Sequence, residues 1–251
     1  MLDHANHQAS GLQGLLPQAA PRLMALVSHG NQQDELPLLW ELCSTLVRLG
    51  YSVAVLDGTS TETDQNPGLI QLLDDTCWRP DGLSEPMSWS VLPSARGLQQ
   101  LCAMPAGDDG PLDPLSPLFQ SHGVVVIYAR ADELVKLLNG SSLEPLLAVS
   151  SQADSPVSAY RALKTLVLNA KLKPTIAAIG PAAADGGREL VHTAAQKLQA
   201  CAMTFLGYQA DCQPLGPRPV MDGTSEPMSR LTLRLLESAL PLPRKHWAGV
   251  R

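Results

Sequence analysis

Short apolar runs alternate with amphipathic segments along most of this chain, and this alternation constrains the fold more than any single motif. Residues 23–27 (LMALV) and 123–129 (GVVVIYA) are typical of strands that are covered on both faces. Residues 36–49 carry apolar side chains at helical spacing, and Gly50 follows as a helix stop. The pattern predicts a doubly wound α/β fold, with a mainly parallel sheet of about seven strands and helices on both faces.

The other expected elements continue the same alternation. We predict further strands at residues 53–56, 89–93, 146–150, 175–179 and 204–209. We predict further helices at residues 67–75, 97–104, 131–138, 156–169, 187–201 and 229–240. Residues 105–117 and 211–228 are rich in Pro and Gly, so we interpret them as surface loops within the same domain.

Composition and charge exclude several classes of protein. Of the 251 residues, 45% are hydrophobic and 17% are charged, which is typical of a globular protein with a substantial core. The formal net charge of −6 argues against a surface built to bind nucleic acid. The 5 cysteines lie apart without a C-x-x-C pair, so we expect free thiols in a reducing cytoplasm and no metal site. The N-terminus carries no secretory signal, and no apolar run approaches the roughly 20 residues that cross a bilayer.

The stretch SHGNQQDEL at residues 28–36 carries the main functional signal. A predicted strand precedes it, and a helix and a second strand ending in Asp57 follow, which is the layout of a phosphate-binding α/β unit. Such a loop needs glycines and a lysine, because backbone N–H groups and a positive charge hold the phosphates. This one has a single glycine, Gly30, no lysine, and the acidic pair Asp34 and Glu35. Two carboxylates would repel a triphosphate, so the sequence argues against ATP binding here.

The whole chain resembles the MinD/ParA class of deviant P-loop ATPases, whose loop has the form x-K-G-G-x-G-K-[ST]. Counting back from Gly50 without a gap places Gly30 at the first lysine and Glu35 at the second. Leu36 then stands where a Ser or Thr would hold magnesium. Tyr128 stands where the family has a magnesium-associated Asp. The resemblance therefore implies a degenerate nucleotide site, no bound cofactor, no catalytic residue, and a pseudo-ATPase rather than an enzyme.

One acidic residue of the family pattern remains. After the second strand the family has an L-D-x-D-like end, and this chain keeps only Asp57 of it. A lone carboxylate has no metal partner here, so we interpret Asp57 as a turn or helix-cap residue.

Three segments resemble the flagellar-number regulator FlhG, also called FleN. SVLPSARGLQQL at residues 90–101 is similar to the family's I-P-A-x-x-G-x-x-x-L segment. LLAVSSQADSPVSAYRALKTL at 146–166 is similar to T-T-P-E-P-T-S-x-x-D-A-Y-A-L-I-K, with Ser158 at the usual Asp. HQASGLQGLL at 7–16 is similar to the N-terminal D-Q-A-x-x-L-R motif, with His7 for the Asp and Gln13 for the Arg.

The N-terminal match implies a protein partner. In the family this motif forms a helix that docks on FlhF, a GTPase of the signal-recognition type, and stimulates GTP hydrolysis. A glutamine can orient the attacking water in such a site, and leucines can pack against a partner. We therefore expect residues 1–21 to be a mobile partner-binding segment, and the alternative is a leader without function. The residues that would bind are Gln8, Ala9, Leu12, Leu15 and Leu16.

The C-terminal part allows two interpretations. Leucines lie on roughly one face of residues 229–240 with basic residues nearby, and family members carry a membrane-targeting helix there. We favour a helix packed on the protein's own core, because prolines end it early, and keep peripheral membrane binding as the alternative. The residues that would bind the membrane are Leu231, Leu235, Leu236, Arg244 and Lys245. Because the prolines end this last helix, we expect an α/β domain over residues 22–240 and a C-terminal tail over 241–251.

These observations lead to one main functional hypothesis. The chain is expected to be an inactive FlhG-like scaffold of the bacterial cytoplasm that acts at the cell pole or the inner-membrane surface and binds no nucleic acid. Alternatives are an accessory of another polar envelope machine such as cellulose secretion, an enzyme with a rebuilt ligand pocket, and an active ATPase with an unconventional site.

Overall fold

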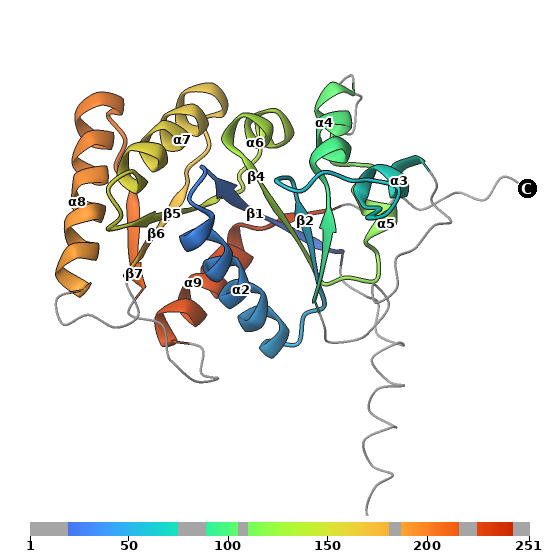
Figure 1. Cartoon of the computed structure of the whole chain (residues 1–251), viewed down its shortest axis with the longest axis horizontal. Helices are drawn as coiled ribbons and strands as arrows, with labels where there is room; N and C mark the ends of the chain where they lie inside the picture. Colours follow the sequence, from blue (N-terminus) through green and yellow to red (C-terminus); the bar gives the residue numbers. More distant parts are fainter. Residues whose placement is uncertain (1–19, 75–88, 105–109, 181–186, 216–224, 243–251) are drawn as a thin grey trace, which may run out of the picture.

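A sheet between two layers of helices forms the protein (Figure 1). The computed structural model describes residues 20–74, 89–104, 110–180, 187–215 and 225–242. Strands and helices alternate through these residues, and the strands between β1 and β7 are all paired in parallel. The predicted α/β fold, with a mainly parallel sheet and helices on both faces, is confirmed.

The strand order places the first strand near the middle of the sheet. Among the described residues the order is β3-β2-β4-β1-β5-β6-β7, and a short β8 runs antiparallel beside the start of β1. The strands are β1 (Arg22–Ser28), β2 (Val53–Asp57), β3 (Trp89–Pro93), β4 (Val124–Arg130), β5 (Leu146–Ser150), β6 (Thr175–Ile179), β7 (Asp211–Leu215) and β8 (Leu240–Pro241).

The helices divide between the two faces because successive side chains of a strand point to opposite sides. In β1, Leu23 and Val27 join the core on one face, and Met24 and Leu26 join the core on the other. Helices α2 and α9 cover the Leu26 face, and the other described helices cover the Leu23 face (Figure 1). The helices are α2 (Gln32–Arg48), α3 (Leu69–Asp74), α4 (Ala95–Ala103), α5 (Leu115–Leu118), α6 (Ala131–Leu138), α7 (Ser155–Ala170), α8 (Gly187–Leu206) and α9 (Glu226–Ser238).

The corner between α3 and α4 shows structural roles for two residues of the 90–101 segment, Arg96 and Gly97. Glu62 is buried, and its carboxylate accepts hydrogen bonds from the backbone N–H groups of Arg96 (2.8 Å), Gly97 (2.8 Å) and Ile70 (3.3 Å). A negative charge at the start of α4 also matches the helix dipole. A Cβ on Gly97 would lie 2.6 Å from Cγ of Leu69, so the glycine lets the two helices approach closely.

The end of α8 corrects two predictions. The strand expected at residues 204–209 is wrong, because Thr204 to Leu206 form the last turn of α8. The helix ends at Gly207, whose φ of 59° is left-handed, and Gly207 N–H and Tyr208 N–H donate to the carbonyls of Met203 and Ala202. The strand comes later, as β7, inside the region 211–228 that was predicted to be a loop. Pro214 fits there because β7 is an edge strand.

The C-terminal residues of the domain return to its first strand. Leu240 and Pro241 pair with Leu23 and Arg22, and Leu242 N–H donates to the carbonyl of Pro21 at 2.8 Å. Residues 241 and 242, which we expected in a C-terminal tail, are therefore bound to the folded domain.

Helix α9 packs on the protein's own core. Leu231, Leu235 and Leu236 are 2%, 3% and 5% exposed and lie against the sheet with α2. The three leucines are therefore part of the core in this structure, and Arg244 and Lys245 lie outside the described residues. None of the described helices combines the length and the apolar character that a bilayer span requires.

Candidate functional site

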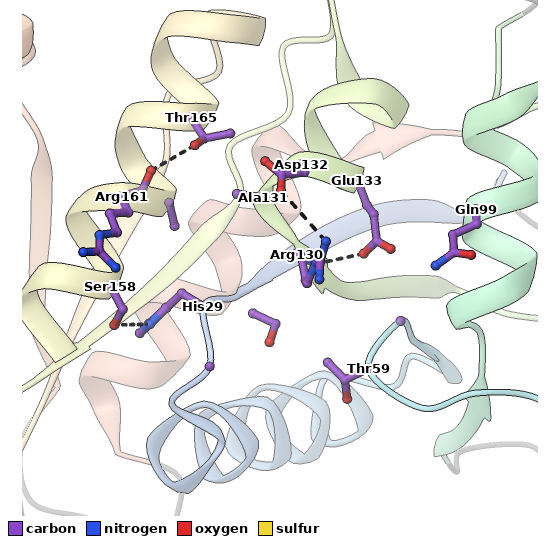
Figure 2. A pocket seen from close by; sticks show the side chains of 14 residues that line it. His29, Thr59, Gln99, Arg130, Ala131, Asp132, Glu133, Ser158, Arg161 and Thr165 are labelled. Carbon is purple, nitrogen blue, oxygen red and sulfur yellow. Dashed lines mark hydrogen bonds and ion pairs between the residues drawn. The ribbon is translucent and has the colours of Figure 1, made fainter. Parts of the chain in front are cut away.

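The candidate site lies at the carboxyl ends of β1, β2 and β4. The connection through α2 leads from β1 to β2 on one side, and the connection through α6 leads from β4 to β5 on the other. Parallel sheets bind ligands where the connections diverge in this way. A cavity of about 590 Å³ lies at this point, lined by the loop after β1, the turn after β2, and the starts of α6 and α7 (Figure 2).

The loop between β1 and α2 is shorter than predicted. Helix α2 was expected to begin at Leu36, but it begins at Gln32, with Asn31 as its first flanking residue. The N–H groups of Asp34 and Glu35 both donate to the carbonyl of Asn31 at 3.0 Å, which closes the first turn. Gly30 has a φ of 95° and makes the left-handed bend before the helix. The residues that a phosphate loop would leave extended are therefore wound into a helix.

The Glu35 carboxylate occupies the backbone donors of this loop. One oxygen, Oε1, accepts from the N–H groups of His29 and Asn31, both at 3.0 Å. The other, Oε2, accepts from the hydroxyl of Tyr128 at 2.6 Å. Glu35 is 0% exposed, so these donors replace water completely. The backbone N–H groups of the loop thus bind a carboxylate of the same chain.

Tyr128 reaches this carboxylate from the sheet. It lies in β4 on the face covered by α2, and its side chain is fully buried. Burial, and second the hydrogen bond to Glu35, raise the pKa of the Tyr128 phenol well above its usual value of about 10. The phenol therefore remains a hydrogen-bond donor to Glu35 across the physiological pH range.

The His29 imidazole ties the loop to β5 and α7. Nδ1 lies 2.9 Å from the Ser158 hydroxyl, and Nε2 lies 2.9 Å from the carbonyl oxygen of Ala148. Figure 2 marks the contact between His29 and Ser158 with a dashed line. Nε2 also lies 3.4 Å from Oε1 of Glu35. Because the carbonyl can only accept, Nε2 carries a hydrogen. The sequence analysis indicated Ser158 only as a departure from a similar segment that has an Asp at this position.

The other predicted site residues make no side-chain contact with this pair that would hold a ligand, although Asp57 lies opposite Tyr128 in the pairing of β2 with β4. Asp57 binds its own turn, because its oxygens accept from Thr59 N–H (2.9 Å), the Thr59 hydroxyl (2.7 Å) and the Ser60 hydroxyl (2.5 Å). Leu36 is 45% exposed on the surface of α2. Of the five predicted residues, the structure therefore joins only Glu35 and Tyr128 by a hydrogen bond.

Two arginines line the cavity, and the sequence assigned neither to a site. Arg130 ends β4, and its side chain lies 4.0 Å from Asp132 in a pair that is 69% and 70% exposed. Arg161 lines the cavity from α7 (Figure 2). The described part of the chain contains no group of three His, Cys, Asp or Glu residues that could hold a metal ion. Its cysteines, Cys43, Cys102, Cys201 and Cys212, are free thiols.

The predicted N-terminal binding residues, Gln8, Ala9, Leu12, Leu15 and Leu16, lie outside the described residues.

Solved structures show which class of protein has this fold. The chain is similar to MinD of the MinC:MinD cell division protein complex of Aquifex aeolicus, with a TM-score of 0.54, 12% identity, and coverage of 88% of this chain and 98% of the other. Cobyrinic acid a,c-diamide synthase from Mycobacterium smegmatis has a TM-score of 0.54 at 15% identity, with 86% and 94% covered. A plasmid partition protein from Borrelia burgdorferi has a TM-score of 0.51 at 13% identity, with 87% and 97% covered.

The fold is thus the one that MinD shares with plasmid partition proteins, as the sequence predicted. Neither a family model nor a curated protein sequence matches the chain. At such low sequence identity the similarity shows the fold but says nothing about the activity.

Proposed function

We propose that this protein is a catalytically inactive regulatory scaffold that acts by binding other proteins. The observation that carries this proposal is the buried Glu35 carboxylate, held at 3.0 Å by two loop N–H groups and at 2.6 Å by Tyr128. A nucleotide phosphate bound at this loop would need the same backbone donors. In the proposed scaffold the Glu35 side chain therefore already binds the N–H groups that a phosphate would need.

Displacing Glu35 would be unfavourable for two reasons. The Tyr128 hydroxyl is buried and would lose its acceptor, which costs about 1–3 kcal/mol. A triphosphate placed beside Glu35 and Asp34 would also be repelled, by about 4 kcal/mol for each pair of unit charges 4 Å apart at an effective dielectric constant of 20. The residues present do not fit a nucleotide with its magnesium ion, because Leu36 and Tyr128 offer no carboxylate or small hydroxyl to the metal.

Isothermal titration with ATP and Mg²⁺ tests this part of the proposal. We expect a dissociation constant of about 1 mM or weaker, and no hydrolysis. Glu35→Lys should bind no better, because Gly30, Leu36 and Tyr128 would be unchanged. A micromolar constant for the wild-type protein would overturn the proposal.

An ATPase with an unconventional site is the second candidate, and the cavity favours it. Its volume of about 590 Å³ is within the range of small-molecule sites, and Arg161 would attract an anion, while Arg130 lies beside Asp132, which lines the same cavity together with Glu133. The same titration separates the two candidates. Micromolar binding that is lost in Arg161→Ala would assign the nucleotide to the cavity, whereas an inactive scaffold shows no such binding in either form.

The sequence resemblance supports a more specific role. The segments 7–16, 90–101 and 146–166 resemble FlhG, so the partner that we propose is an FlhF-like GTPase of the signal-recognition type. The protein would then control the number or placement of flagella from the cytoplasmic side of the cell pole. Another polar envelope machine, such as cellulose secretion, is the alternative assignment. That the protein binds no nucleic acid stays a prediction, supported by its net charge of −6.

A further inference from the structure

An apolar surface lies where α2 meets the edge of the sheet. It consists of the exposed residues Leu36, Trp40 and Val91 and the partly buried Trp89, and we call it the Trp40 surface. Trp40 is 62% exposed, and its ring meets that of Trp89 edge to face at 4.7 Å. Leu36, 45% exposed, lies one turn before Trp40 on the same side of α2. Val91, 51% exposed, lies on the same face of β3 as Trp89.

The two edges of the sheet differ in their protection. Within the described residues β3 pairs only with β2, so one side of its backbone is left without a strand partner. Its sequence, WSVLP, has no charged residue and has proline only at its end. The opposite edge strand, β7, carries Asp211, which is paired with Arg234, and Pro214. Edge strands without charges or internal proline tend to pair with another segment.

We propose that residues 1–19 of the same chain cover the Trp40 surface through Leu12, Leu15 and Leu16. The point at which this segment leaves the domain is fixed. Pro21 accepts from Leu242 N–H at 2.8 Å, and the Arg22 side chain donates to the carbonyl of Leu236 at 2.8 Å. The segment therefore starts from a defined position at the amino end of β1.

The strand register shows that the leucines can reach the surface. Arg22 lies opposite Val124, Val124 opposite Val53, and Val53 opposite Trp89. Trp89 is thus in the same row of the sheet as Arg22, three strand spacings or about 14 Å away. A fully extended chain spans at most about 14 Å over the four residues from Ala20 to Leu16 and about 29 Å over the eight residues to Leu12. Leu12 therefore reaches Trp89 easily, and Leu16 reaches it only when the chain is fully extended.

The chemistry of the segment fits this surface. Residues 1–19 contain one carboxylate side chain, Asp3, and no lysine or arginine. Because the segment is tethered so close to the surface, its effective concentration there is about millimolar, which favours docking in the same molecule. The docking that we propose does not depend on a GTPase partner, and it would compete with any partner that takes the same leucines.

Hydrogen exchange of the full-length protein tests the proposal. We compare the wild type with a variant carrying Leu12→Ser, Leu15→Ser and Leu16→Ser, so the chain length is unchanged. We expect the amides of β3 to exchange about tenfold faster in the variant, while those of α7 stay the same. Equal exchange of β3 in both proteins would overturn the proposal. Protection that persists in the variant and rises with protein concentration would also overturn it, because a second copy would then cover the edge.

Proteolysis tests whether Trp40 protects residues 1–19. Thermolysin, which cleaves before leucine, should cut within residues 1–19 several times faster in Trp40→Ser than in the wild type. Phe205→Ser is the matched control, because Phe205 is a 71% exposed aromatic residue on α8, which covers the other face of the sheet. Equal cleavage of the Trp40→Ser and Phe205→Ser proteins would contradict docking on the Trp40 surface.

Discussion

At the scale of single residues, the pair of Glu35 and Tyr128 decides what the loop after β1 can bind. A buried carboxylate is costly unless its hydrogen bonds are complete, and here the loop N–H groups and the phenol provide them. The sequence indicated each residue as a departure from the ATPase pattern. It could not predict their contact, because that depends on Tyr128 facing α2 and on α2 starting early enough to turn Glu35 inward.

Tyr128→Phe tests this pair. Removing the hydroxyl leaves a buried carboxylate oxygen without its donor, so we expect a loss of about 1.5–3 kcal/mol in the free energy of unfolding at pH 7. Because the folded protein holds the pKa of Tyr128 above its unfolded value, this contribution is complete below about pH 10. It falls as the pH rises further toward the folded pKa. Denaturant titrations from pH 7 to pH 11.5 measure both effects.

A second tyrosine provides the control. The Tyr208 hydroxyl lies 3.4 Å from the carbonyl of Pro174 and is partly buried, so Tyr208→Phe should change the stability by about 0.5 kcal/mol or less. If Tyr128→Phe costs no more than this control at pH 7, the hydrogen bond to Glu35 is not what holds the loop.

At the scale of elements, the strands were the easiest to predict. The bounds of β3, β5 and β6 match the expected residues, because a short run of apolar residues between turn signals is enough to define a buried strand. The start of α2 was missed because residues 32–35 are polar and form a helix through contacts with the loop and β4. The two residues of β8 carry no local signal, since only pairing with β1 defines them.

The predicted strand at residues 204–209 failed for a different reason. Thr204 and Phe205 favour strands by themselves, but the packed helix before them continues through this turn. Gly207, in a left-handed conformation, was the signal that could have placed the helix end correctly.

Glu62 gives a prediction for the α3–α4 corner. Its carboxylate accepts three backbone N–H groups, and in Glu62→Gln an NH₂ group would replace one of the accepting oxygens. We expect a loss of about 1–3 kcal/mol in the free energy of unfolding and faster hydrogen exchange in α3 and α4. Glu133→Gln is the matched control, because Glu133 accepts at the exposed start of α6, from Arg130 N–H at 3.2 Å. An equal loss in both variants would mean that burial of Glu62 adds nothing.

At the scale of the whole molecule, the fold and the proposed partner rest on different kinds of observation. The repeated strand–helix pattern was sufficient to predict the layers of the sheet and helices, and similar solved structures have the same fold. The partner cannot be predicted in this way, because a fold does not determine which side chains bind, and Gln8, the residue that we propose acts on the partner, lies outside the described residues.

The GTPase assay tests the proposed partner. Adding the full-length protein to a GTPase of the signal-recognition type from the same cell should accelerate GTP hydrolysis, because a glutamine can position the attacking water. Gln8→Ala should remove at least about tenfold of this acceleration, with an unchanged circular dichroism spectrum. The matched control is Gln18→Ala, which changes a glutamine that is not among the predicted binding residues and should keep the full effect.

Two results would contradict this prediction. Equal acceleration by Gln8→Ala and the wild type would mean that Gln8 has no catalytic role. If the wild-type protein does not accelerate GTP hydrolysis, the flagellar role is wrong, and a role in another polar envelope machine becomes the better proposal.

The pairing of β8 with β1 also determines how the domain responds to force. Pro21 and Leu242 are joined by a hydrogen bond of 2.8 Å, so the two ends of the described domain leave from one point. Tension applied between these ends would act on the antiparallel pair from its open end and break its few bonds one after another. β1 would stay in place, because it is paired with β4 along its whole length. Tension between the ends should therefore separate β8 from β1 before it reaches β4, the strand that carries Tyr128.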